Sequence, residues 1–128
     1  MIQELKDIVA RVDALNLFQY TNWYLGQEIP RLPAFVLDRA DKFFEPLDAT
    51  AKIYNARLTF WGFILAKMSM DDAAFDDLVD KTLKELASNP NYAYAELQES
   101  VLDVLVIEEY EIKAVFFKME YLRRENLV

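Results

Sequence analysis

The segment Ala51–Met68 constrains the fold more than any other part of the chain. Its aromatic and β-branched side chains alternate between two faces, as in a strand. One face carries Tyr54, Ala56, Leu58, Phe60 and Ile64, and the other carries Ile53, Trp61, Phe63 and Leu65. This pattern predicts a long strand that is polar on one side at its start and buried on both sides later. A buried helix is the alternative, because alanine and lysine are also present.

An amphipathic helix is predicted directly after this segment, from Asp71 to Ser88. Its apolar stripe consists of Phe75, Leu78, Val79, Thr82, Leu83 and Leu86. Ser69 followed by Asp72 resembles a capping box at its start. Aspartates in the first turns suit the positive end of the helix dipole, and Asn89-Pro90 ends the helix.

The first half of the chain predicts one further helix and two short strands. Met1–Leu15 has apolar residues at helical spacing. Phe18–Leu25 is rich in aromatic residues and Ala34–Leu37 is an apolar run, so both are predicted strands. Asp38–Thr50 has polar ends and two aromatic residues in its middle, which indicates a loop.

The C-terminal third allows two interpretations. Val101–Ile107 and Ala114–Leu122 fit two strands joined by a polar turn at Glu108–Glu111. A single long helix, Tyr94–Arg124, fits almost as well, and the low count of two glycines favours it. The strand interpretation gives a single α+β domain, residues 1–128, in which an N-terminal and a central helix pack on a mostly antiparallel sheet. The helical interpretation gives an all-α bundle.

The composition argues against an enzyme. The chain has no His and no Cys, so the commonest general base, thiolate nucleophiles and zinc–thiolate sites are missing. Its few serines lack a Gly-x-Ser-x-Gly context, and there is no glycine-rich phosphate loop. We therefore expect no catalytic residues, no cofactor and no metal. The aspartates at positions 71, 72, 76, 77 and 80 are expected to be a solvated helix start rather than a cation site.

The net charge and the hydropathy of the chain limit which partners and which cellular compartment we expect. The net charge of −8, from 14 basic and 22 acidic residues, disfavours wrapping of nucleic acid. No apolar run approaches 18 residues and the amphipathic start does not have the features of a signal peptide, so we expect no membrane association. Hydrophobic residues form 54% of the chain, which is high for a monomer and predicts that some are covered by partner subunits.

Several stretches resemble the small tail terminator (tail completion) proteins of long-tailed bacteriophages and prophages. They are PAFV at 33–36, ARLTFWGFILAK at 56–67, SMDDAAFDDLVD at 69–80, LKEL at 83–86 with Asn89-Pro90, and VFFKMEYLR at 115–123. In that family a central strand runs into an acidic-capped helix that ends near an Asp-Pro or Asn-Pro, and a last strand finishes with Tyr and Arg. The resemblance covers residues 30 to 124 and consists of patterns of residue type.

The resemblance implies a structural role in the virion. Such proteins form a ring, commonly a hexamer, on the last ring of the tail tube, where they stop polymerisation and provide the surface that joins the head connector. It implies self-association, contact with the tail tube protein and the connector, DNA that passes through the lumen without specific binding, and location in the virion tail after assembly in the host cytoplasm.

Candidate interface and lumen residues follow from the same reasoning. The aromatic candidates for a partner or oligomer interface are Trp23, Tyr24, Phe43, Phe44 and Trp61, because buried aromatic residues dominate interface energetics. Packing of these side chains in the core of the chain is the alternative. The acidic residues Glu108, Glu109 and Glu111 are expected either in a solvated turn or in an acidic lumen. The alternative function is an all-α adaptor or regulatory protein that binds one partner protein, and a small-ligand pocket protein is a third hypothesis.

Overall fold

The computed structural model describes residues 1–23, 30–50 and 52–126, and it confirms the α+β fold with a mostly antiparallel sheet. The described elements are α1 (Ile2–Asp13), β1 (Tyr20–Asn22), β2 (Ala34–Pro46), β3 (Ile53–Lys67), α2 (Asp72–Ala87), β4 (Tyr94–Ile107) and β5 (Tyr110–Asn126). The sheet order is β1-β2-β3-β5-β4, and only the β1–β2 pairing is parallel.

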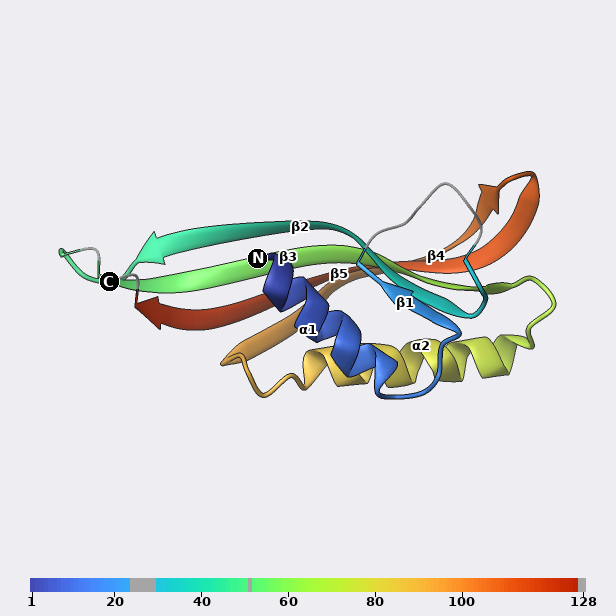
Figure 1. The fold of residues 1–128 in the computed structure, drawn as a ribbon, viewed down its shortest axis with the longest axis horizontal. Coiled ribbons are helices and arrows are strands. Elements are labelled where there is room, and N and C mark those ends of the chain that lie inside the picture. Colours follow the sequence, from blue (N-terminus) through green and yellow to red (C-terminus); the bar gives the residue numbers. More distant parts are fainter. Residues whose placement is uncertain (24–29, 51, 127–128) are drawn as a thin grey trace.

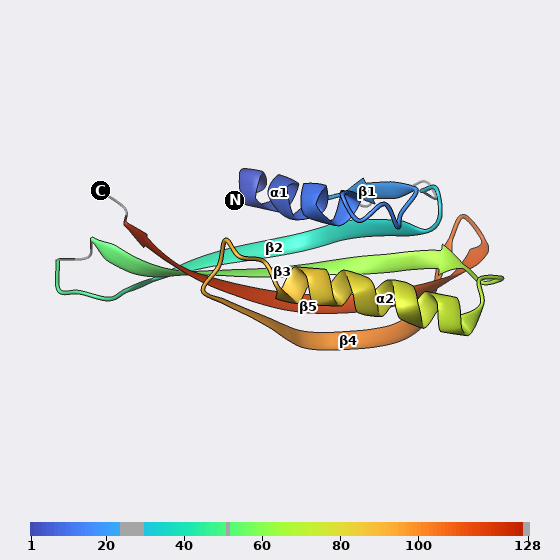
Figure 2. The ribbon, with the colours of Figure 1, turned by 90° about the horizontal axis from the view of Figure 1, so that it is seen from below.

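Both helices cover the same face of the sheet, and the main core lies between them and the strands (Figures 1 and 2). Each helix buries most of the apolar stripe that its sequence predicts, which includes Ile8 and Val12 on α1 and Phe75 and Leu86 on α2. The strands contribute Phe35, Leu58, Phe60, Ile64, Phe117, Met119 and Tyr121. A smaller apolar cluster on the other face consists of Ala34, Val36, Leu65, Ile112 and Ala114.

The long strand predicted for Ala51–Met68 is confirmed as β3, in the middle of the sheet. It pairs with β2 on one side and β5 on the other. At the end where β2 stops, these three strands extend beyond both helices as a projecting arm (Figure 1). We use the name "arm" for Phe43–Pro46 of β2 and the residues of β3 and β5 that pair with them.

One local prediction in the first half is wrong, and another is confirmed only in part. Asp38–Thr50 is not a loop, because β2 continues without interruption to Pro46 and pairs with β3 beyond a register shift between Leu37 and Arg39. Charged residues are compatible with this strand because the arm has no helical layer to cover it. The strand predicted for Phe18–Leu25 is only Tyr20–Asn22, and its last two residues lie outside the described part of the chain.

The C-terminal third is a hairpin, so the helix predicted as the alternative for Tyr94–Arg124 is wrong, and so is the all-α bundle. Glu108 and Glu109 form its turn with positive φ angles of 51° and 70°. Glycine and asparagine normally occupy such positions, and two glutamates occupy them here. The low glycine content was therefore a misleading signal.

The start of α2 also differs from the prediction. The residue that caps the helix is Asp71, whose side chain accepts a hydrogen bond from the Ala74 N–H.

Candidate interaction surfaces

The arm exposes two adjacent aromatic residues that do not belong to either described core cluster. Phe43 is 65% exposed and Phe44 is 44% exposed. They project to opposite faces because successive strand residues alternate. Phe44 contacts the edge of the Tyr54 ring, with 6.0 Å between ring centroids, whereas Phe43 lies opposite Arg57 on the face without helices. The structure thus leaves both predicted interface residues accessible, on a strand rather than on the predicted loop.

The other aromatic candidates differ in their surroundings. Trp61 is half-buried, with the Arg39 guanidinium 4.5 Å and the Lys118 ammonium 5.4 Å from its ring centroid. These two cations cover the ring, so Trp61 is less available to a partner than Phe43. Trp23 is exposed beside the start of α1, where it lines a small pocket of about 210 Å³ with Ile2. Tyr24 lies outside the described residues.

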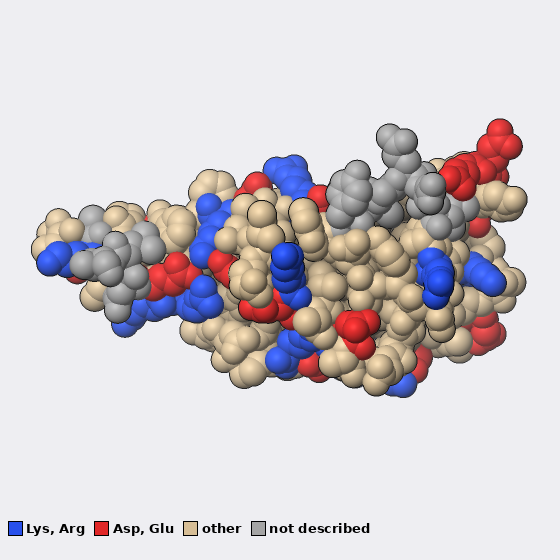
Figure 3. Space-filling view, viewed as in Figure 1, with Lys and Arg blue, Asp and Glu red and all other residues tan. Residues whose placement is uncertain are grey.

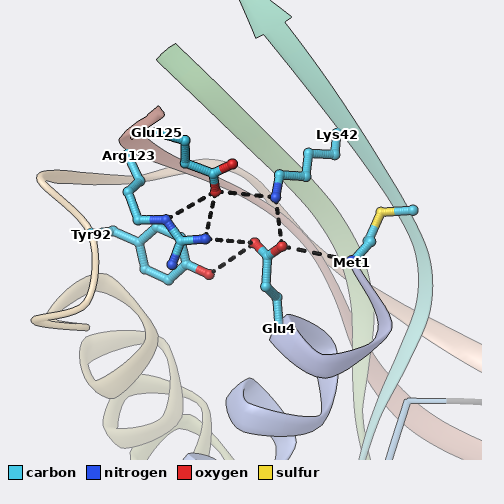
Figure 4. A network of polar contacts seen from close by, with 6 residues as sticks. All are labelled: Met1, Glu4, Lys42, Tyr92, Arg123 and Glu125. Atoms are coloured by element: carbon cyan, nitrogen blue, oxygen red, sulfur yellow. Dashed lines mark hydrogen bonds and ion pairs between the residues drawn. The ribbon is translucent and has the colours of Figure 1, made fainter. Parts of the chain in front are cut away.

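A network of charged residues joins α1 to the base of the arm (Figure 4). The Lys42 ammonium on β2 lies 2.6 Å from Glu4 of α1 and 3.2 Å from Glu125 of β5. Arg123 lies 2.5 Å from Glu125 and 3.7 Å from Glu4, and the Tyr92 hydroxyl donates a hydrogen bond to Glu4. Four elements of the chain, among them the loop before β4, thus meet at one carboxylate.

The network shifts the titration of its members in the directions expected for mutual stabilisation. Burial alone would lower the pKa of Lys42, but hydrogen bonds to Glu4 and Glu125 raise it above its usual value. Burial alone would raise the pKa of Glu125, but hydrogen bonds from Arg123 and Lys42 hold it below its usual value. Burial and the neighbouring Glu4 raise the pKa of Tyr92 to about 12, so this phenol stays protonated at neutral pH.

The second exposed surface is strand β4 at the edge of the sheet. It is 14 residues long, and most of its side chains are exposed although many are apolar. Leu102 and Val106 are 71% and 66% exposed on the side of the sheet that faces the helices. Beside them lies a groove of about 650 Å³ that α2 and β4 line together with Lys113. Lys113 donates hydrogen bonds to the Met70 carbonyl and to Asp72 at the start of α2.

Acidic side chains gather at this end of the molecule, where the β4–β5 hairpin turns (Figure 3). Glu108, Glu109 and Glu111 are all exposed there, and the first two form the turn. Within the described part of the chain, no group of three or more acidic side chains has the arrangement of a metal site. This finding covers the aspartates of α2, of which Asp71 caps the helix and Asp72 pairs with Lys113.

Two functional features are missing from the sequence interpretation. The network around Glu4 depends on contacts between residues 38 or more positions apart, which local patterns do not reveal. The exposed edge of β4 did have a sequence signal. Between Tyr94 and Ile112 the chain has six acidic residues and no basic one, whereas a buried strand has few charges of any kind.

Comparison with known proteins adds no family to this description. No family model and no curated protein sequence matches the chain. Among the described residues, no helix is long and apolar enough to cross a membrane.

Proposed function

We propose that this protein is a virion assembly protein that acts, like the phage tail terminators it resembles, as a ring that caps the tail tube and forms the head-joining surface. The observation that carries the proposal is the arm. Its strands extend beyond the helices, and Phe43 and Phe44 on it are exposed (Figure 1). An arm of this kind suits packing against a neighbouring copy, where large aromatic residues contribute most of the interface energy.

The shape of the molecule supports a ring over a symmetric dimer. The arm lies at one end of an elongated chain, and the turn of the acidic β4–β5 hairpin lies at the other (Figures 1 and 3). An arm that packs on an unlike surface of the next copy makes a head-to-tail contact, and such contacts produce rings when the rotation closes. The net charge of −8 is compatible with DNA that passes through such a ring without binding.

The test compares two double variants with matched exposed apolar residues. Phe43→Ser/Phe44→Ser removes the aromatic pair of the arm, and Leu102→Ser/Val106→Ser removes a similarly exposed pair on β4. Each protein is mixed with tail tubes of the phage or prophage whose genes flank its own and imaged by electron microscopy. We expect wild type and the β4 variant to cap the tubes and limit their length, and the arm variant to fail.

Sedimentation velocity on the purified proteins shows whether the ring also forms without the tube. Uncapped tubes with wild-type protein would contradict the proposed function. Capping by the arm variant would contradict the role of the arm alone. A gene position between the head-connector genes and the major tail tube gene would support the proposal independently.

A further inference from the structure

The outer edge of β4 is a free pairing edge. The strand pairs with β5 along one side, and in the described part of the chain no strand pairs with its other side. Most proteins protect such an edge with lysine, proline or a short strand. β4 has neither lysine nor proline and is more than twice the usual strand length. Its outward backbone N–H and C=O groups are therefore available to an added strand, apart from the Val104 N–H, which donates a hydrogen bond to the Asp103 carboxylate.

The two sides of β4 differ in chemistry. Leu102, Val104 and Val106 project toward the helix-covered face, where their pairing partners are Val115, Lys113 and Glu111. Glu96, Glu99 and Asp103 project toward the other face, where their partners are Glu120, Lys118 and Ala114. A strand that pairs with this edge meets mainly apolar side chains on the helix-covered side. On the other side it meets these three acidic residues together with the apolar Val101, Leu105 and Ile107.

The charge of this region excludes a second copy as a favourable occupant. Residues 94–112 hold six acidic side chains and no basic one, so they account for −6 of the net charge of −8. Pairing of β4 with β4 would bring like charges together, which is destabilising. The outer side of β2 beyond β1, Asp38–Pro46, carries three acidic and two basic residues. One of these bases, Lys42, is already held by Glu4 and Glu125.

We infer that the β4 edge binds an extended segment of a different protein by strand addition, and that this segment alternates apolar residues with Lys or Arg. Its apolar side chains lie beside Leu102, Val104 and Val106, and enter the groove lined by Phe75 and Met68. Its cations lie opposite Glu99 and Asp103. The site is separate from the arm, so the inference does not depend on ring formation.

The first experiment measures the affinity of the full chain for three synthetic peptides of about ten residues, the usual length of a long strand. The first peptide alternates Val and Lys, and the second alternates Val and Glu. The third has the sequence of the first, except that Pro replaces its central Val. We expect the Val/Lys peptide to bind at least about tenfold more tightly than either of the others. Its affinity should fall with added salt, because part of the attraction is electrostatic.

The second experiment changes the protein. Glu99→Lys/Asp103→Lys reverses two exposed charges on β4, and Asp13→Lys/Glu45→Lys makes the same charge change on α1 and the arm. The first variant should bind the Val/Lys peptide at least about tenfold more weakly and the Val/Glu peptide more tightly. The control should stay within about twofold of wild type, and circular dichroism verifies that both variants are folded.

Four results would overturn the inference. Failure of the Val/Lys peptide to bind, or equal affinity for the Val/Glu peptide, would remove the charge argument. Equal affinity for the proline peptide would show charge attraction without strand pairing. Self-association of wild type that Glu99→Lys/Asp103→Lys abolishes, without peptide binding, would make a second copy the occupant. None of these results bears on capping by the arm.

Discussion

The arm and the β4 edge are both exposed strand surfaces, yet their chemistry differs. The arm carries aromatic side chains and is tied at its base to α1 by charges of both signs (Figure 4). The β4 edge carries aliphatic side chains and only negative charge. Apolar exposure alone would assign both surfaces to the same kind of partner. The charge pattern separates them, because an edge whose charged side chains are all acidic repels the same edge of a second copy.

The largest expected effect lies in the core that both surfaces share. Phe117 is fully buried, stacks on Phe35 with 5.8 Å between ring centroids and contacts the edge of Phe60. Phe117→Ala should lower the free energy of unfolding by about 3–5 kcal/mol, because it removes apolar contacts and leaves a cavity. Urea denaturation monitored by circular dichroism measures the change.

The matched control is Phe43→Ala, the same substitution on the arm. An exposed side chain contributes little to the monomer, so we expect a change within about 0.5 kcal/mol. Measurements belong at a concentration where sedimentation shows a monomer. A loss at Phe43 comparable to that at Phe117 would show that the arm is part of the core, and the comparison between the two surfaces would fail.

A smaller effect is expected where the arm meets α1. Glu125 loses its charge in Glu125→Gln and with it the ion pairs to Lys42 and Arg123. The variant should be less stable than wild type by about 1 kcal/mol near neutral pH, within the range of hydrogen bonds to charged groups at partly exposed positions. Urea denaturation over a range of pH measures the difference.

The direction of the pKa shift of Glu125 predicts how the stability difference between wild type and Glu125→Gln changes with pH. The folded pKa of Glu125 lies below its ordinary value of 4.5, so its contribution is complete above that value and is lost as the pH falls through the lowered pKa. The difference between wild type and variant should therefore shrink in acid. Glu45→Gln, the same substitution at an exposed glutamate of the arm, is the control for the loss of one carboxylate. A constant difference across the acid range would exclude the network as its cause.

The two surfaces also differ in how far the sequence predicts them. Alternation identified β3, and the stripe of apolar residues identified both helices, because a buried face imposes its period on the sequence. Where no layer covers a strand, that period is absent. The uncovered end of β2, Phe43–Pro46, is part of the Asp38–Thr50 segment that looked like a loop. Lys42, at the base of this end, reaches Glu4 and Glu125 from a strand. Such contacts depend on distant residues and leave no local pattern.

The smallest expected effect concerns the turn that aligns β4 with β5. Glu109 has a φ of 70°, in the left-handed region that glycine adopts without a steric penalty. Glu109→Gly should raise the free energy of unfolding by about 0.5 kcal/mol, whereas Glu111→Gly, in the regular strand β5, should lower it by about 0.5–1 kcal/mol. Urea denaturation distinguishes the two signs. A loss of stability at Glu109 would mean that the turn differs from the one described. The register that places Leu102, Val104 and Val106 on the helix-covered face, and Glu99 and Asp103 on the other, would then differ as well.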